Sequence, residues 1–550
     1  MTRSILSLLG FLLVFTAAAQ PDFYKDYSFT EADTLRGMLR PERTCYDVTW
    51  YGLNIKVEPE KKFISGYVDI AFNAVEDFNR LQIDLYDNMK IIKMEMEGKE
   101  LTWNRRFNAV FVDFPAVHKG TSGRFRVYYE GNPHIAQNPP WDGGFVWASD
   151  EKDRPWIGVA CEGDGASLWW PNKDHLSDEP DSMSISVSVP ADLMCVANGN
   201  LRKTTEEGAF TRYDWAVSYP INNYNVSINI AHYAHFGDTY IAADGDKLAL
   251  DYYVLDYNLE KARKHFEQVK PMLACYEMYM GKYPFWNDGY ALVETPYLGM
   301  EHQGAIAYGN RYMKGYLGGM IPRGQDWDYI IIHESGHEWY GNSITANDLA
   351  EMWIHESFTT YLESVYIECR YGDEEALAYL RMQRFGIMNR EPIIGPKDVN
   401  FEDWQGGDHY NKGAWILNTL RHAIGNDDLW WKIFKGFYQS HARTNITSED
   451  FFNYVNEQTG QNWTPFFDQY FRYPGIPTLE YSLTEKGKNL VVKYRWLADV
   501  TGFNMPVLVG NPNNMTRIQP TGEWQETVIK DLSKGDFEVA TDRFYIRTKG

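Results

Sequence analysis

The stretch Tyr329-Ile330-Ile331-Ile332-His333-Glu334-Ser335-Gly336-His337 decides how the rest of this 550-residue sequence is interpreted. Two imidazoles four residues apart on a helix lie about 40° apart around its axis, so both can face one metal ion. Glu334 is placed where its carboxylate can reach a metal-bound water without being a ligand. The apolar, β-branched run before His333 favours a buried helix over a solvated one. The motif therefore predicts a metal centre within a packed domain.

A second helical pattern, over residues 348–370, offers a third ligand. Its apolar residues fall on one stripe and Gly372 follows its end, which is typical of an amphipathic helix. A helix–turn–helix hairpin can fold Glu356 back over the first helix. His333, His337 and Glu356 would then form a His2Glu site for one Zn2+ ion, with a position open for water, which is typical of catalytic zinc. The competing interpretation is a surface helix with two solvated histidines.

The first residues have the features of an export signal. Arg3 supplies a positive charge, residues 5–15 are apolar, and Ala17-Ala18-Ala19 before Gln20 forms a small-residue cleavage site. The apolar run is too short to span a bilayer, and no later segment has the pattern of a membrane span. We therefore predict a signal peptide at residues 1–19, a secreted or periplasmic protein and no transmembrane anchor.

The mature chain divides into three blocks by the period of its apolar residues. The first block, residues 20–254, mainly alternates from about Cys45 onward, as in Val68-Asp69-Ile70-Ala71-Phe72 and in Leu81-Gln82-Ile83-Asp84-Leu85, which predicts a half-buried antiparallel sheet. Residues 255–475 turn helical. Residues 476–550 return to short strands and are long enough for one small β-sandwich. The predicted fold class is therefore multidomain α+β.

Charge and cysteine content exclude several classes of function. A net charge of −22 disfavours binding to nucleic acid or to an anionic membrane surface. The five cysteines are too few and too scattered for a disulfide framework, and their odd number leaves at least one free or paired with another chain. None has CxxC spacing, which argues against a thiolate metal site. Nothing in the sequence selects an oligomeric state.

Three further segments, with the zinc motif, make the chain similar to the gluzincin aminopeptidases of the alanyl aminopeptidase and leukotriene hydrolase family. Leu298-Gly299-Met300-Glu301-His302 resembles the family's Gly-x-Met-Glu-Asn loop, and Tyr410-Asn411-Lys412-Gly413 resembles its Tyr-x-Lys-Gly turn. Cys161-Glu162-Gly163-Asp164-Gly165-Ala166 resembles the segment that contacts the substrate amine. The resemblance implies an N-terminal β-saddle domain, a thermolysin-like, mainly α catalytic zinc domain and a small C-terminal β-sandwich.

The resemblance also implies a reaction. Zinc would lower the pKa of its water and polarise the scissile carbonyl, while Glu334 would act as general base and later protonate the leaving amine. Tyr410 would donate its phenol to the oxyanion.

The remaining matching residues would bind the substrate. Glu301 and Glu162 would clamp the free α-ammonium of a peptide, which restricts cleavage to the first peptide bond. Gly299 and Met300 belong to the same loop, and the glycine allows its backbone to approach the substrate closely. The implied function is a zinc aminopeptidase whose partners are peptides with a free N-terminus.

Some positions depart from the family pattern. Leu298 stands where glycine is usual, His302 where asparagine is usual, and the third ligand lies in His355-Glu356-Ser357 instead of Asn-Glu-Gly. Residues 173–177 interrupt the family's Phe-Pro-x-x-Asp-Glu-Pro pattern. His355 should face away from the metal, because adjacent helix positions diverge by about 100°. We interpret three other histidines as structural, not as catalytic or metal-binding residues: His302, His409 and His422.

Two alternative functions remain. The first is a related zinc enzyme, either an endopeptidase or a lipid-epoxide hydrolase. An endopeptidase should lack an anionic amine clamp, and epoxide hydrolysis in the family accompanies a large C-terminal helical domain for which this sequence leaves no room. The second is an inactive peptide-binding homologue, which would usually have lost a metal ligand or the base.

Overall fold

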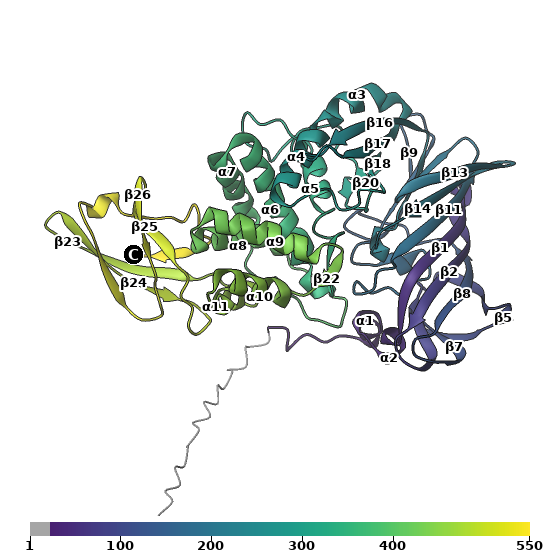
Figure 1. Ribbon diagram of the computed structural model, residues 1–550, viewed down its shortest axis with the longest axis horizontal. Helices are drawn as coiled ribbons and strands as arrows, with labels where there is room; N and C mark the ends of the chain where they lie inside the picture. Colours follow the sequence, from purple (N-terminus) through teal and green to yellow (C-terminus); the bar gives the residue numbers. More distant parts are fainter. Residues whose placement is uncertain (1–22) are drawn as a thin grey trace, which may run out of the picture.

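Residues 23–550 are described by a computed structural model (Figure 1). The predicted signal peptide, residues 1–19, lies outside the described residues. In Figure 1 a β-rich block lies at one end of the molecule, a helical block in the middle and a smaller β block at the C-terminal end. This is the multidomain α+β class that the sequence predicts. Within residues 23–550, no helix combines the length and the apolarity that crossing a membrane requires.

The β-rich block is built on an eight-stranded sheet with the order β13-β14-β11-β1-β2-β8-β4-β5. Val68, Ile70 and Phe72 of β2 point into the core, as their alternation predicts. β11 pairs antiparallel with β14 but parallel with β1. The predicted antiparallel arrangement is therefore wrong for the β1–β11 pair. The reason is a long connection that brings β11 back beside the first strand. The strands are β1 (Tyr46–Glu58), β2 (Phe63–Ala74), β4 (Met89–Met96), β5 (Lys99–Glu100), β8 (Ser122–Gly131), β11 (Ser182–Pro190), β13 (Asn200–Glu207) and β14 (Phe210–Val217).

Two smaller sheets and two short helices complete this block. The sheets have the orders β3-β7-β6 and β12-β15-β10-β9. Their strands are β3 (Phe78–Asp84), β6 (Thr102–Arg106), β7 (Ala109–Val117), β9 (Gly144–Ser149), β10 (Pro155–Ala160), β12 (Met194–Ala197) and β15 (Ile228–Ala231), and the helices are α1 (Glu31–Gly37) and α2 (Pro41–Thr44).

Gln82 and Asp84 of β3 are buried on the face predicted to be exposed, so the prediction of a half-buried strand is wrong at these two positions. Gln82 and Asp84 are 0% and 3% exposed because the N-terminal helices cover this face of β3. Gln82 Nε2 donates to Leu35 O at 2.9 Å, and Arg43 Nη2 donates to Asp84 Oδ2 at 2.7 Å. Buried polar groups need such partners, and here the partners come from a segment of the chain that the alternation cannot reveal.

A five-stranded mixed sheet joins the β-rich and helical blocks, with the order β16-β17-β18-β20-β19. Its strands are β16 (Tyr233–Ile241), β17 (Lys247–Leu255), β18 (Tyr290–Glu294), β19 (Gly299–Met300) and β20 (Ile306–Tyr308). β17 pairs parallel with β18, so this sheet includes residues on both sides of the domain boundary that the sequence predicts between residues 254 and 255. That domain boundary stays a prediction. The edge strand β19 leads directly into Glu301.

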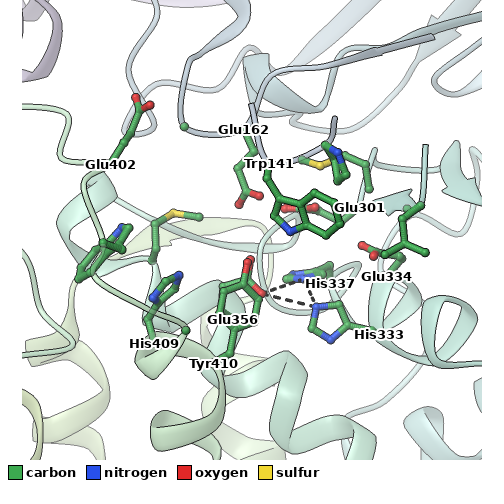
Figure 2. A pocket seen from close by; sticks show the side chains of 18 of the residues that line it. Trp141, Glu162, Glu301, His333, Glu334, His337, Glu356, Glu402, His409 and Tyr410 are labelled. Carbon is green, nitrogen blue, oxygen red and sulfur yellow. Dashed lines mark hydrogen bonds and ion pairs between the residues drawn. The ribbon is translucent and has the colours of Figure 1, made fainter. Parts of the chain in front are cut away.

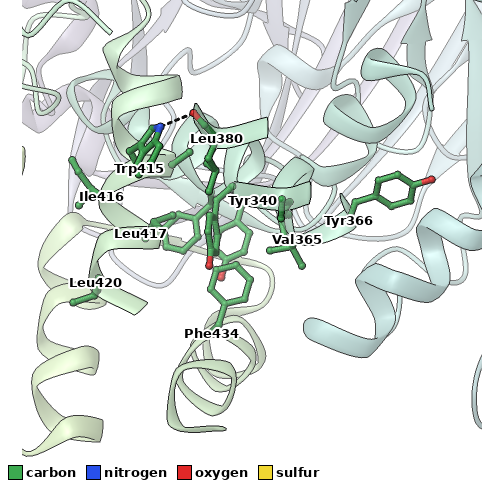
Figure 3. Packing of buried hydrophobic residues seen from close by; sticks show 14 of the residues in the cluster. Tyr340, Val365, Tyr366, Leu380, Trp415, Ile416, Leu417, Leu420 and Phe434 are labelled. Carbon is green, nitrogen blue, oxygen red and sulfur yellow. Dashed lines mark hydrogen bonds between the residues drawn. The ribbon is translucent and has the colours of Figure 1, made fainter. Parts of the chain in front are cut away.

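The helical block packs around α6, which is buried from Trp353 to Ile367. Figure 3 shows the aromatic and aliphatic core between these helices, where Trp415 Nε1 donates to Leu380 O at 2.7 Å. Such close packing fixes the relative positions of the helices that carry the predicted site residues. The helices are α3 (Leu259–His265), α4 (Val269–Tyr279), α5 (Tyr329–Gly336), α6 (Trp353–Tyr371), α7 (Asp373–Gln383), α8 (Asp408–Ile424), α9 (Asp427–His441), α10 (Ser448–Thr459) and α11 (Thr464–Phe471).

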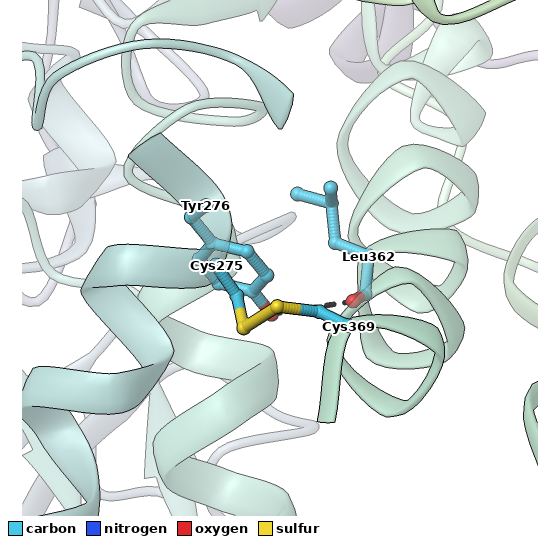
Figure 4. Close-up of a disulfide and its surroundings, with 4 residues drawn as sticks. All are labelled: Cys275, Tyr276, Leu362 and Cys369. Carbon is cyan, nitrogen blue, oxygen red and sulfur yellow. Dashed lines mark hydrogen bonds between the residues drawn. A yellow bond between two sulfur atoms is a disulfide. The ribbon is translucent and has the colours of Figure 1, made fainter. Parts of the chain in front are cut away.

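A disulfide joins Cys275 on α4 to Cys369 on α6 (Figure 4). The other three cysteines, Cys45, Cys161 and Cys195, are buried and free. The two partners are 94 residues apart, and only the packing of α4 against α6 brings them together, so their spacing in the sequence could not indicate the pair.

The C-terminal block consists of two sheets with the orders β27-β24-β23-β29 and β26-β25-β28. This arrangement agrees with the small β-sandwich predicted for this block. It is attached to α8, because Asn418 Nδ2 donates to Arg543 O at 3.0 Å. The strands are β23 (Thr478–Lys486), β24 (Asn489–Leu497), β25 (Val507–Asn511), β26 (Asn514–Ile518), β27 (Gln525–Ile529), β28 (Glu538–Val539) and β29 (Arg547–Lys549).

Candidate active site

Helix α5 presents His333 and His337 at its C-terminal end. The Asp328 side chain caps the other end of this helix by accepting hydrogen bonds from the Ile330 and Ile331 amides. Both imidazoles are buried, and their Nε2 atoms face each other at 3.2 Å. Two unprotonated ring nitrogens this close together are the arrangement expected around a shared cation.

Helix α6 brings Glu356 to the same point (Figure 2). Its Oε2 lies 3.5 Å from His333 Nε2 and 3.4 Å from His337 Nε2. A tetrahedral zinc ion with ligands at about 2.0–2.1 Å requires ligand separations of roughly 3.3–3.4 Å, so these three atoms fit it without rearrangement. Glu356 Oε2 is buried and has no hydrogen-bond partner among the described residues, which suits a metal ligand.

The far nitrogen of each imidazole is held by an acceptor. His333 Nδ1 lies 2.6 Å from Glu363 Oε1, and His337 Nδ1 lies 3.0 Å from Tyr340 O. Each Nδ1 therefore carries the proton, and each Nε2 keeps its lone pair for a metal. Sequence analysis missed Glu363. The available signal was its position seven residues after Glu356, which places both carboxylates on one helix face.

A cavity of about 470 Å³ lies over these ligand atoms and is lined by all nine predicted site residues. Glu334 projects into it next to Gly299 of β19. A Cβ at position 299 would lie 2.7 Å from Glu334 Oε1, so the strand can pass this close to the carboxylate only with glycine. Met300 lines the cavity beside it. Burial raises the pKa of Glu334 to about 7, against the opposing charges of His333 and His337.

Glu301 and Glu162 form an anionic wall of the cavity, above the three ligand residues in Figure 2. Glu301 Oε1 accepts a hydrogen bond from Tyr224 OH at 3.2 Å. Burial, reinforced by the charge of Glu301, holds the pKa of Glu162 well above its ordinary value. No lysine or arginine occurs among the described residues that line the cavity. These carboxyl groups resist ionising together, so a cationic ligand group that stabilises their charged forms is favoured here.

Tyr410 lies in the first turn of α8, and its ring stacks against the His333 ring with 6.2 Å between centroids. This turn is pressed against α6. A Cβ at position 413 would overlap Ser357 Oγ, so Gly413 is required for the approach. Ser357 Oγ donates to His409 O at 2.6 Å. The departure from the family pattern at Ser357 thus supplies a hydrogen bond between the helices that carry the third ligand and Tyr410.

His355 faces away from the metal ligands, in agreement with the helix geometry. Its Nε2 accepts a hydrogen bond from the Ala346 amide at 2.9 Å, so Nδ1 carries the proton. His355 Nδ1 lies 3.5 Å from Tyr224 OH and 4.0 Å from Glu162 Oε1. The ligand atoms of Glu162, Glu301 and His355 all lie within 4.8 Å of one another. His355 therefore belongs to the anionic wall, a location that sequence analysis missed.

Three other ring side chains, His302, His409 and Trp141, lie in different environments. His302 is fully buried, and burial lowers its pKa to about 3. His409 lines the cavity next to Tyr410. Trp141, which the sequence did not single out, also lines the cavity with 64% exposure, and in the view of Figure 2 its ring lies between Glu162 and Glu301.

Comparisons with known proteins agree with this geometry. Residues 258–470 match the Peptidase family M1 domain. A leucyl aminopeptidase from Saccharolobus solfataricus is 20% identical over 418 residues, which are 73% of this chain and 51% of that protein. An aminopeptidase N from Lactococcus lactis is 25% identical over 195 residues, 33% of this chain and 22% of that protein. This chain thus spans about half the length, or less, of these curated relatives.

Solved structures share the fold. The M1 zinc metallopeptidase from Deinococcus radiodurans superposes with a TM-score of 0.64 at 20% identity, covering 78% of this chain and 94% of that chain. A variant of it bound to a Tyr-Ser-Ala substrate gives a TM-score of 0.65 at 20% identity, with coverage of 79% and 95%. Residues 258–470 of this chain therefore match the peptidase family M1 domain, and the shared fold agrees with the resemblance of its motifs to the gluzincin aminopeptidases.

Proposed function

We propose that this protein is a zinc aminopeptidase that hydrolyses the N-terminal peptide bond of peptides. The observation that carries the proposal is the anionic wall of Glu162 and Glu301 beside the His333–His337–Glu356 trio, in one cavity. A metal trio alone suits many hydrolases, whereas a pair of carboxyl groups next to it, Glu301 buried and Glu162 half-buried, selects a substrate with a positive charge close to the scissile bond. The free α-ammonium of a peptide has this charge at this position.

His333, His337 and Glu356 would hold the zinc ion. When bound, zinc supplies a Lewis acid that polarises the scissile carbonyl and lowers the pKa of water. Glu334 projects into the same cavity and would take the proton of the attacking water and return it to the leaving amine. Because its side chain is not part of the trio, Glu334 can exchange protons while the ligands stay in place.

Tyr410 would donate its phenolic proton as a hydrogen bond to the developing oxyanion. Its side chain enters the cavity from α8, on the side of the trio opposite Glu334 in Figure 2. Burial raises the pKa of Tyr410 well above its ordinary value, which keeps the hydroxyl a donor at neutral pH.

Glu162 and Glu301 would bind the α-ammonium and place it at a fixed distance from the trio. A peptide with additional residues before the scissile bond could not satisfy these carboxylates, which would remain buried and unpaired at a large cost in free energy. This requirement argues against an endopeptidase. An inactive peptide-binding homologue would retain the wall but needs no base, and Glu334 and Tyr410 are both present in the cavity.

We also propose export to an oxidising compartment. The signal-like first residues and the Cys275–Cys369 disulfide support it, since disulfides persist mainly outside the cytosol. Intact-mass analysis of the protein from its native host should show cleavage after Ala19 and the oxidised cysteine pair, and a full-length, reduced chain would contradict export.

The test of the activity compares a free-amine aminoacyl anilide with its N-acetyl derivative. The free-amine substrate should be hydrolysed, chelation should abolish hydrolysis and zinc should restore it. The acetylated substrate should resist cleavage because it has no ammonium for Glu162 and Glu301. Glu334→Gln should retain zinc but lose turnover by orders of magnitude. Equal rates on both substrates would refute the exopeptidase assignment, and full turnover by Glu334→Gln would place the base elsewhere.

A further inference from the structure

The segment that carries Glu162 is held by a helix from outside the M1 domain. Arg36, on α1, donates from Nη2 to the carbonyl oxygen of Gly163 at 2.8 Å. It donates from Nη1 to Tyr86 OH at 3.0 Å, and the same nitrogen lies 3.8 Å from Glu402 Oε1. The Arg36 side chain is 19% exposed. The Arg36 guanidinium therefore contacts Gly163, the residue that directly follows Glu162, and Glu162 lines the cavity.

We propose that Arg36 is a positioning residue that holds Glu162 in place to bind the substrate ammonium. This inference rests on the proposed aminopeptidase function and adds the N-terminal segment to the working site. Arg36 does not line the cavity and would not touch the substrate, so it would act only through the backbone of residues 162–165.

The loop closes on itself through Gly165 N, which donates to Cys161 O at 2.7 Å, but two of its residues are glycines. Gly163 and Gly165 have φ of +78° and +85°, a region that glycine enters freely. The carboxylate of Glu162 is also repelled by Glu301 and Glu356, which lie in the same cavity. Without an anchor, this repulsion would favour conformations that turn Glu162 toward solvent.

The Gly163 carbonyl is the point where the two blocks meet. It accepts from Arg36 in the N-terminal segment and from Asn400 Nδ2 at 3.3 Å in the M1 domain. Asn400 is in turn held by Glu402. A Cβ at position 165 would lie 2.6 Å from Arg36 Nη2, so the guanidinium also packs directly against the second glycine. Removing Arg36 would leave the weaker Asn400 bond as the only described anchor of this carbonyl.

Helix α1 is itself held by one of the residues that interrupt the family pattern and by Arg43. His175, within residues 173–177, lies with Nε2 3.2 Å from Gly37 O, and Ser177 N donates to His175 Nδ1 at 3.2 Å, so the Nε2 nitrogen carries the proton and donates to α1. Arg43 donates to the carbonyl oxygen of Arg36. These contacts place α1 between the inserted residues and the Glu162 loop, which gives the insertion a structural purpose.

The experiment compares Arg36→Met with Glu31→Gln in the zinc-loaded enzyme. Glu31 lies on the same helix and pairs with Arg106 on the outer surface, so it controls for general damage to α1. Arg36→Met should raise KM for a free-amine anilide about tenfold, the loss expected when one charge-assisted hydrogen bond is misaligned, with a smaller change in kcat. Arg36→Lys should recover part of the loss. Glu31→Gln should leave both constants unchanged.

Two inhibitors separate positioning from general destabilisation. Leucine hydroxamate has a free amine and acetohydroxamate has none. Arg36→Met should weaken the binding of leucine hydroxamate about tenfold. The binding of acetohydroxamate and the zinc content should stay unchanged. Equal weakening of both inhibitors, or none, would overturn the inference. If Arg36→Met does not fold, Arg36→Lys carries the same comparison.

A double-mutant cycle shows whether the effect passes through Glu162. In a Glu162→Gln background, Arg36→Met should cause little further loss, because the residue it positions is already disabled. Additive losses would overturn the inference and indicate an action through Glu402. If the wild-type protein hydrolyses no free-amine substrate, the proposed function fails, while the inhibitor comparison still decides the role of Arg36.

Discussion

Replacing Glu363 with glutamine should weaken zinc binding without disturbing the three proposed ligands, His333, His337 and Glu356. Glu363 is fully buried on α6, and one of its oxygens lies 2.6 Å from His333 Nδ1. The other oxygen accepts from Tyr379 and Gln383. A glutamine of nearly the same shape can keep its carbonyl oxygen on His333, so the imidazole keeps its tautomer. The substitution then removes mainly the negative charge.

The magnitude follows from the role of that charge. A carboxylate that accepts from a ligating imidazole raises the basicity of the ring, and losing such a partner typically costs 10–100-fold in metal affinity, or about 1.4–2.7 kcal/mol. We expect the larger end of this range, since the amide nitrogen of glutamine would also face Gln383 Nε2, which is itself a donor. At saturating zinc, turnover should recover most of its wild-type value.

Competition against a chelator of known affinity measures the zinc dissociation constant of Glu363→Gln. Glu368→Gln is the matched control, because Glu368 lies on the same helix and pairs with Arg421 outside the cavity. An unchanged zinc constant in Glu363→Gln, or an equal loss in Glu368→Gln, would refute the argument that the Glu363 carboxylate tunes His333.

Three further predictions follow from the same structure. Tyr410→Phe should lower kcat on the order of 100-fold with unchanged zinc content, and a smaller loss would remove Tyr410 from oxyanion binding. Replacing Cys275 and Cys369 by serine should lower the free energy of unfolding by up to about 4.7 kcal/mol, the chain-entropy value for a loop near 100 residues, and denaturant titration with and without reductant would show no difference if the bond does not form. Burial, aided by Arg43, lowers the pKa of His175 to about 3. The unfolded chain therefore binds the extra proton first, and stability should fall as pH decreases from about 6.5 toward 3, by about 2 kcal/mol at pH 5. Urea unfolding at pH 7 and pH 5 should show a smaller difference in His175→Asn than in the wild type, and equal differences would contradict a His175 ring that stays neutral in the folded protein.

Local patterns in the sequence predict the part of the site that lies on single elements. The four-residue spacing of His333 and His337 defines one helix face, and the alternation in β2 defines its buried side. Glu356, Glu301 and Tyr410 each stand in a short motif, and the structure brings them to one cavity although their roles stay predictions.

Contacts between distant segments could not be predicted from the sequence. Asp84 is buried because α2 supplies Arg43, and β11 lies parallel to β1 because of a long connection. Arg36 reaches Gly163 across 127 residues. In each case the decisive partner is far away in the chain and has no periodic or spacing signal, so only the packed structure reveals it.

The close approach of α6 and α8 at Gly413 and Ser357 has a consequence for substrate length. Glu356 and Tyr410 lie on helices joined by the hydrogen bond from Ser357 Oγ to His409 O, so we expect them to move as one unit, whereas Glu162 belongs to the other block. In the proposed aminopeptidase, a hinge motion between the two blocks would change the gap that the first residue of a peptide fills, while Glu356 and Tyr410 keep their relative positions. Variants that widen this gap should thus accept peptides with additional residues before the scissile bond while they still hydrolyse that bond.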